Sequence, residues 1–184
     1  MNNDNKQNDL KIVNILSHSR HDWMNKLQLI KGNLSLEKYD RIKDIIEEIV
    51  IEAQQESKLC NLKMPCFASF LLTYNWNNHP IYVEYEVLGD VTVLEHFDER
   101  VTQWCSGFLG ILNQTVDSTY ENHLCITIDT DTTGHETVKF KVDFEGKINH
   151  IHHVEEWLHS SDGTKLLPDN FHIDTFELNT TISL

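Results

Sequence analysis

Two long stretches of helical periodicity near the start of the chain most constrain its fold. In the first, residues of one row recur every three or four positions and so line one side of a helix. The row is Leu10, Val13, Leu16, Arg20, Trp23, Leu27 and Ile30, and only Arg20 is polar. This row predicts a helix over 10–31. A second helix is predicted over 36–63, where the rhythm continues until Pro65 stops it.

The residues around this pair of helices set its limits. Gly32 and Asn33 tolerate the left-handed backbone that ends many helices, and Ser35 is a good N-cap for the second helix. We therefore expect a helical hairpin over 10–64. Residues 1–9 are polar and rich in asparagine, so we expect a disordered lead-in there.

The second predicted helix has more apolar surface than one neighbour can cover. Besides its main row it carries Ile45, Val50, Ile51, Leu59 and Leu62. Each helix of a hairpin buries only one side against the other, so the remaining apolar surface needs another partner. A second copy of the hairpin, which makes a four-helix bundle in a homodimer, is the favoured interpretation. Cover by the C-terminal part of the same chain is the alternative.

A second row on the first helix is polar throughout and contains a histidine suited to phosphoryl transfer. This polar row is Asn14, His18, His21, Asn25 and Gln28, and its spacing places it on one face beside the apolar row. Imidazole is nucleophilic near neutral pH and can carry a phosphoryl group on a ring nitrogen. His21 is therefore the candidate phosphoacceptor. His18, which has no adjacent acid, competes with it, and an ordinary surface histidine is the remaining alternative.

Four neighbours of the candidate phosphoacceptor are candidate supporting residues. Asp22 can hold the opposite ring nitrogen or act as a base, and Asn25 can donate to phosphoryl oxygens or to a partner protein. Arg20 and Lys26 can offset phosphoryl charge. Structural alternatives stand beside these roles: Asp22 and Lys26 as solvated charges, and Arg20 paired with Glu56 or another carboxylate in the bundle.

The distribution of charge excludes some classes of partner. Residues 1–64 contain ten basic and ten acidic residues, so the net charge of −14 falls entirely on residues 65–184. Because this field repels polyanions, we expect neither nucleic-acid nor membrane binding. Cys60, Cys66, Cys105 and Cys125 lack metal-type pair spacing, and no apolar run reaches membrane-spanning length. Reduced thiols and a cytoplasmic location are expected.

Residues 65–184 combine strand and helix patterns. Strands are predicted over 81–87, 124–128 and 138–144, with one or two more within 171–184, and a turn is predicted near Thr133 and Gly134. Helices are predicted over 97–118 and 151–158. The pattern indicates an α+β fold with a C-terminal α/β sandwich. The cluster of His150, His152 and His153 near Glu155 and Glu156 is interpreted as surface residues rather than as a metal site.

The chain resembles the histidine phosphotransferases of the endospore phosphorelay. The resemblance is most specific from His18 to Asn33, around Arg-His-Asp-Trp-Met-Asn-Lys, and continues through Glu84–Gly89 and Glu121–Leu124. It implies that His21 accepts a phosphoryl group from the aspartyl phosphate of a single-domain response regulator. The group then passes to the aspartate of a second, DNA-binding response regulator that controls sporulation. Mg²⁺ is expected in the partner regulator, and no cofactor is expected in this chain.

A His-Asp-x-x-Asn helix is also found in sensor histidine kinases, so an ATP-dependent autokinase is the main alternative. Such a kinase needs an Asn-rich helix and an Asp-x-Gly-x-Gly loop to bind Mg-ATP. Gly110 and Gln114 stand where asparagines are expected, and the sequence contains no Asp-x-Gly-x-Gly. The C-terminal domain therefore resembles a kinase ATP-binding domain that has lost its nucleotide site. A third hypothesis is a non-catalytic adaptor that sequesters response regulators.

Overall fold

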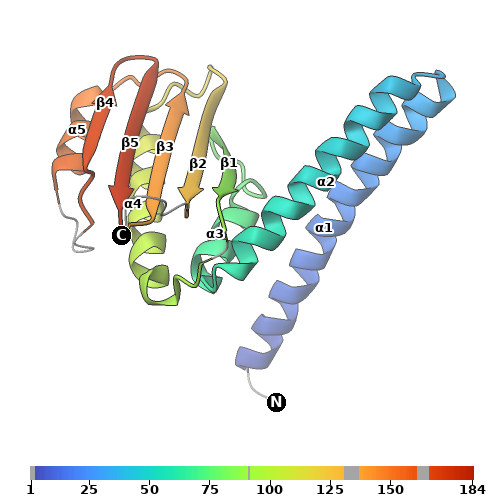
Figure 1. Cartoon of the computed structure of the whole chain (residues 1–184), viewed down its shortest axis with the longest axis horizontal. Coiled ribbons are helices and arrows are strands. Elements are labelled where there is room, and N and C mark those ends of the chain that lie inside the picture. Colours follow the sequence, from blue (N-terminus) through green and yellow to red (C-terminus); the bar gives the residue numbers. More distant parts are fainter. Residues whose placement is uncertain (1–2, 91, 131–136, 161–165) are drawn as a thin grey trace. The chain divides into compact units, whose positions relative to one another are not determined.

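The computed structural model describes residues 3–90, 92–130, 137–160 and 166–184 (Figure 1). The predicted turn at Thr133 and Gly134 lies outside these residues. The chain divides into two compact units, Met1–Gln54 and Gln55–Leu184. A helical N-terminal region followed by an α/β region confirms the predicted fold class. Within the part of the chain that the structure describes, no helix is both long and apolar enough to cross a membrane.

The first unit contains helix α1 (Asn3–Ser35) and most of helix α2 (Tyr39–Asn61), which run side by side as a hairpin (Figure 1). Helix α1 begins earlier than predicted, so residues 3–9 are helical and the prediction of a disordered lead-in was wrong. The physical reason is that extending an existing helix by one residue costs far less than nucleating a new one, even for weak helix formers.

The turn between the two helices also differs from the prediction. Gly32, Asn33 and Ser35 all lie inside α1, and the side chains of Asn33 and Ser35 donate to carbonyls four residues earlier, at 2.9 and 3.0 Å. Because both side chains form hydrogen bonds within the last turns of α1 itself, neither acts as the expected cap. The left-handed backbone falls instead on Glu37, whose φ is 56°.

The second unit is a five-stranded sheet covered on one face by helices (Figure 1). The strands are β1 (Ile81–Leu88), β2 (Asn122–Asp129), β3 (Lys139–Glu145), β4 (Asn170–Ile173) and β5 (Glu177–Ser183), in the order β1-β2-β3-β5-β4. Strand β1 is parallel to β2, and the other pairs are antiparallel. The helices are α3 (Pro65–Tyr74), α4 (Asp98–Thr115) and α5 (Ile151–His159), and a short 3₁₀ helix spans Glu95–Phe97.

Alternate residues of the strands point into a core shared with the three helices, which confirms the period-two patterns read from the sequence. The core also contains the end of α2 and the residues just after it: Leu59 and Leu62 are 0% exposed and Met64 is 1% exposed. The compact unit begins at Gln55, whereas the predicted domain boundary lies between Met64 and Pro65.

Helix α3 was absent from the predicted elements. Pro65 occupies its start, and its amides are capped from another element: the carboxylate of Asp98 accepts hydrogen bonds from the backbone N–H groups of Cys66 (3.0 Å) and Phe67 (2.8 Å). The contact with Asp98 also raises the pKa of the Cys66 thiol. Proline favours the first position of a helix, but Pro65 was interpreted only as the end of the preceding helix, and the cap of α3 comes from a residue far along the chain.

Side chains cover the outer edge of strand β1. Asn75 exchanges two hydrogen bonds with the backbone of Val83, at 2.7 and 3.0 Å. At Val87 the backbone N–H donates to Gln55 Oε1 (2.7 Å) and the carbonyl accepts from Lys58 Nζ (3.1 Å). These contacts satisfy backbone groups that would otherwise be open to pairing with another strand, and they tie the end of α2 to the sheet.

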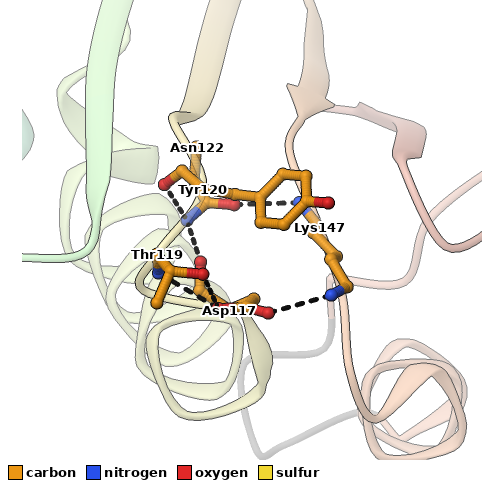
Figure 2. Close-up of polar contacts among 5 residues, drawn as sticks. All are labelled: Asp117, Thr119, Tyr120, Asn122 and Lys147. Atoms are coloured by element: carbon orange, nitrogen blue, oxygen red, sulfur yellow. Dashed lines mark hydrogen bonds and ion pairs between the residues drawn. The ribbon is translucent and has the colours of Figure 1, made fainter.

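A polar network joins the end of α4 to the loops that precede β2 and follow β3 (Figure 2). Buried Asn122 donates to the carbonyls of Asp117 (2.9 Å) and Tyr120 (3.1 Å) and accepts from the backbone N–H of Lys147 (2.9 Å). Asp117 accepts from Thr119 (2.7 Å) and from Lys147 Nζ (3.0 Å). These donors, Thr119 first, lower the pKa of Asp117 to about 2.

The surroundings of two glycines predict opposite effects of alanine, and one of them, Gly146, adjoins this network. A Cβ on Gly146 would collide with Asn122 Oδ1 and would lie 2.6 Å from Phe144 Cζ, whereas a Cβ on Gly110, inside α4, meets nothing within 4 Å. Gly146→Ala is expected to lower the free energy of unfolding by about 1–3 kcal/mol. Gly110→Ala is expected to raise it by roughly 0.5–1 kcal/mol, because alanine restricts the unfolded chain. Urea denaturation of both variants measures the difference, and equal effects would contradict it.

Candidate functional site

The polar row of α1, defined above as Asn14, His18, His21, Asn25 and Gln28, is exposed along its whole length. The side chain of His21 is 72% exposed. The helical phase read from the sequence therefore places the candidate phosphoacceptor at the surface, where another protein can reach it. His18 lies one turn earlier on the same face and is also exposed.

Two side chains contact the same nitrogen of the His21 ring. Asp22 Oδ1 lies 3.5 Å from Nδ1, and Asn25 Nδ2 lies 3.3 Å from Nδ1. Within the described part of the chain, these two polar contacts of the ring both involve Nδ1 and none involves Nε2. The structure therefore brings Asp22 and Asn25 together at Nδ1, and Nε2 is the ring nitrogen that carries neither contact.

The two cations near His21 are held by different partners. Arg20 donates to Ser17 Oγ within α1 (3.3 Å) instead of pairing with Glu56. Lys26 forms an ion pair with Glu52 of α2 and lies 5.7 Å from the centroid of the Trp23 ring. The sequence did not identify Glu52 or Ser17 as partners. Nothing local marks Glu52, because it is 26 positions from Lys26.

Large apolar side chains remain exposed along the hairpin. On α1 they are Leu10, Ile12, Val13, Ile15, Leu16, Trp23, Met24, Leu27, Leu29 and Leu34, and on α2 they are Tyr39, Ile46, Val50 and Ile51. Leu27 is 54% exposed, and in this hairpin only Ile45 is fully buried among the described residues before Gln55. So much apolar surface is unusual for a soluble helix pair standing alone.

In the α/β unit, the structure shows the contacts of two further regions: the helix that corresponds to the nucleotide-binding helix of a kinase, and the histidine cluster. Asn113 of α4 exchanges hydrogen bonds with the hydroxyl of Tyr74 (2.8 and 3.2 Å), so this amide is engaged within the fold. Of the cluster, His152 lies 3.1 Å from Glu156. No group of three or more potential metal ligands occurs in the described ranges. All four cysteines are free thiols.

Comparisons with known proteins give two family matches. Residues 63–183 match the model described as "Sporulation initiation phospho-transferase B, C-terminal", and residues 1–62 match the alpha-helical domain of the "Sensor_kinase_SpoOB-type". Sporulation initiation phosphotransferase B of Bacillus subtilis is 46% identical over 136 residues, which cover 74% of this chain and 70% of the relative.

Solved structures give weaker similarities. The catalytic domain of histidine kinase ThkA is 12% identical with a TM-score of 0.44, and the match covers 69% of this chain and 91% of that one. The blue-light activated histidine kinase of Erythrobacter litoralis EL346 is 13% identical with a TM-score of 0.41. That match covers 93% of this chain and 58% of the kinase chain.

Proposed function

Because the chain belongs to the sporulation initiation phosphotransferase B family and is a phosphorelay phosphotransferase, we propose that His21 is its phosphoacceptor. The observation that supports this most is the exposed imidazole with both ring contacts on Nδ1. In this proposal His21 takes the phosphoryl group from the aspartyl phosphate of a single-domain response regulator in the cytoplasm. It then passes the group to the aspartate of a DNA-binding response regulator that controls sporulation.

The proposed step is an in-line displacement. The lone pair of His21 Nε2 attacks phosphorus, the bond from phosphorus to the donor aspartate oxygen breaks, and the aspartate leaves as a carboxylate. When Nδ1 carries a proton, the phosphorylated ring is positively charged, and Asp22 at 3.5 Å stabilises that charge. Mg²⁺ is assigned to the acidic pocket of the regulator. This chain is proposed to supply neither nucleotide nor metal.

Arg20 and Lys26 are proposed as supporting cations, but they differ in how easily each side chain can turn toward a phosphoryl group. Among the described residues, the contact of the Arg20 guanidinium is with a neutral hydroxyl, at 3.3 Å, so Arg20 can turn toward a docked phosphoryl group without leaving a carboxylate. Lys26 must first leave Glu52. The structure therefore favours Arg20 as the cation that offsets phosphoryl charge, and Lys26 as a link between the two helices.

The exposed apolar face of the hairpin is proposed to pack against a second copy, forming a four-helix bundle with two His21 sites. Leu27→Glu is expected to weaken self-association by at least ~100-fold, because each copy would bury an unpaired carboxylate. Sedimentation velocity over a concentration series measures this. Gln28→Glu makes the same change of charge on the polar row and should remain dimeric. A wild-type chain that is monomeric at every concentration would contradict the dimer.

The function is tested by following labelled phosphate. Incubation with a phosphorylated response regulator and Mg²⁺ should place label on this chain, and a second regulator should then remove it. Incubation with Mg-ATP alone should give no label, since Gly110 and Gln114 replace the asparagines that a kinase needs. Label from Mg-ATP would favour the autokinase. Regulator binding without any transfer of label would favour the adaptor.

A further inference from the structure

Asp22 and Asn25 make opposite demands on the nitrogen that they share. A carboxylate can only accept, so its contact requires a proton on His21 Nδ1. The amide NH₂ of Asn25 can only donate, so its contact at 3.3 Å requires a bare Nδ1. A neutral imidazole carries one ring proton, and the two contacts therefore select different tautomers.

The distances favour one of the two. The Asn25 contact meets the distance of a weak hydrogen bond, whereas Asp22 at 3.5 Å lies outside the usual range for an N–H···O bond. With Asn25 donating to Nδ1, the ring proton sits on Nε2. That nitrogen then has no lone pair with which to attack phosphorus.

We propose that Asn25 is a positioning residue that holds resting His21 in the tautomer protonated on Nε2, and that it also slows loss of the phosphoryl group once His21 is phosphorylated. The second half rests on the proposed function of His21. When a response regulator docks, the Nδ1 contact moves from Asn25 to Asp22: Nε2 gives its proton to water, Nδ1 takes one from water, and the lone pair of Nε2 becomes available. Asn25 therefore slows phosphorylation of His21 until a partner docks.

The same contact governs the phosphorylated ring. When the bond between phosphorus and Nε2 breaks, the ring takes the bonding electron pair. A ring protonated on Nδ1 leaves as neutral imidazole, whereas an unprotonated ring must leave as the much more basic imidazolate. Asn25 donates to bare Nδ1 and so stabilises the unprotonated, slowly reacting form. Asp22 accepts from Nδ1–H and stabilises the reactive form, so the pair sets how long the phosphoryl group is held.

The first half is tested without any partner, by ¹⁵N NMR of the His21 ring in the full-length chain at alkaline pH. Asn25→Ala is expected to shift the tautomer ratio about five-fold toward the Nδ1–H form, the size of effect that one hydrogen bond produces. Asn25→Asp, which places an acceptor where the donor was, should shift it further in the same direction. Asn14→Ala, on the same polar row but seven residues from His21, should leave it unchanged. Ring shifts in Asn25→Ala identical to the wild type would overturn the inference.

The second half is tested by loading His21 chemically with phosphoramidate and following hydrolysis in the absence of any regulator. The phosphorylated form of Asn25→Ala should decay about five-fold faster than the wild type, and Asp22→Asn should decay more slowly. Equal lifetimes of the wild type and Asn25→Ala would overturn this half. If these differences appear but no regulator can phosphorylate His21, the proposed function fails while the inference about Asn25 is supported.

Discussion

Replacing His21 by alanine is expected to reduce phosphoryl acceptance from a phosphorylated response regulator by at least ~1,000-fold, to the level of background labelling. His18, the competing imidazole, is not expected to take over, because it lies one helical turn away from the nitrogen that must be in line with the phosphorus of a docked regulator. The imidazole is 72% exposed on α1, and alanine is the best helix former. The fold should therefore be unchanged in circular dichroism, so lost labelling would report chemistry rather than unfolding.

The matched control is His18→Ala, which removes an exposed imidazole one turn away on the same face. This variant should accept label within about three-fold of the wild-type rate, since effects of exposed substitutions away from the reacting atoms are small. If His21→Ala still accepts label while His18→Ala does not, the assignment moves to His18. Label on both variants would remove the polar row from the proposal altogether.

What the sequence predicted well was local. The placement of His21 and Asn25 on one exposed face follows from their spacing of four residues along one helix, and the structure confirms it. The strands of the sheet were readable because one face is buried and the other open, which gives a period of two. In both cases the pattern can be read within a single helix or strand, without knowing which other element it packs against.

What the sequence did not predict depends on distant residues. Helix α3 takes its cap from Asp98, more than thirty positions after its first residue. Lys26 takes its partner, Glu52, from the other helix of the hairpin. The predicted caps at the turn were wrong for a different reason. Asn33 and Ser35 are residue types that often cap helices, yet here both side chains donate to carbonyls one turn earlier in α1.

The largest effect on stability is expected where the second unit begins. A fragment of residues 55–184 should fold, whereas a fragment of residues 65–184 should not, although the predicted boundary falls between Met64 and Pro65. The shorter fragment lacks the side chains of Leu59, Leu62 and Met64, which are 0%, 0% and 1% exposed in the core. Loss of each large apolar side chain costs about 2–5 kcal/mol. Together they approach the whole stability of a domain, about 5–15 kcal/mol.

The polar contacts of the same segment add to this expectation. Without Gln55 and Lys58, the backbone N–H and carbonyl of Val87 lose their partners, and this edge of β1 opens to aggregation. Near-UV circular dichroism and urea denaturation of the two fragments measure the difference. Leu59→Ala in the longer fragment should lower its free energy of unfolding by about 2–5 kcal/mol. Its exposed neighbour provides the control, since Cys60→Ala should change stability by less than ~0.5 kcal/mol. Equal urea midpoints for the two fragments would show that the end of α2 only lies against the sheet. A folded long fragment and an unfolded short one would show that this helix end is part of the α/β core.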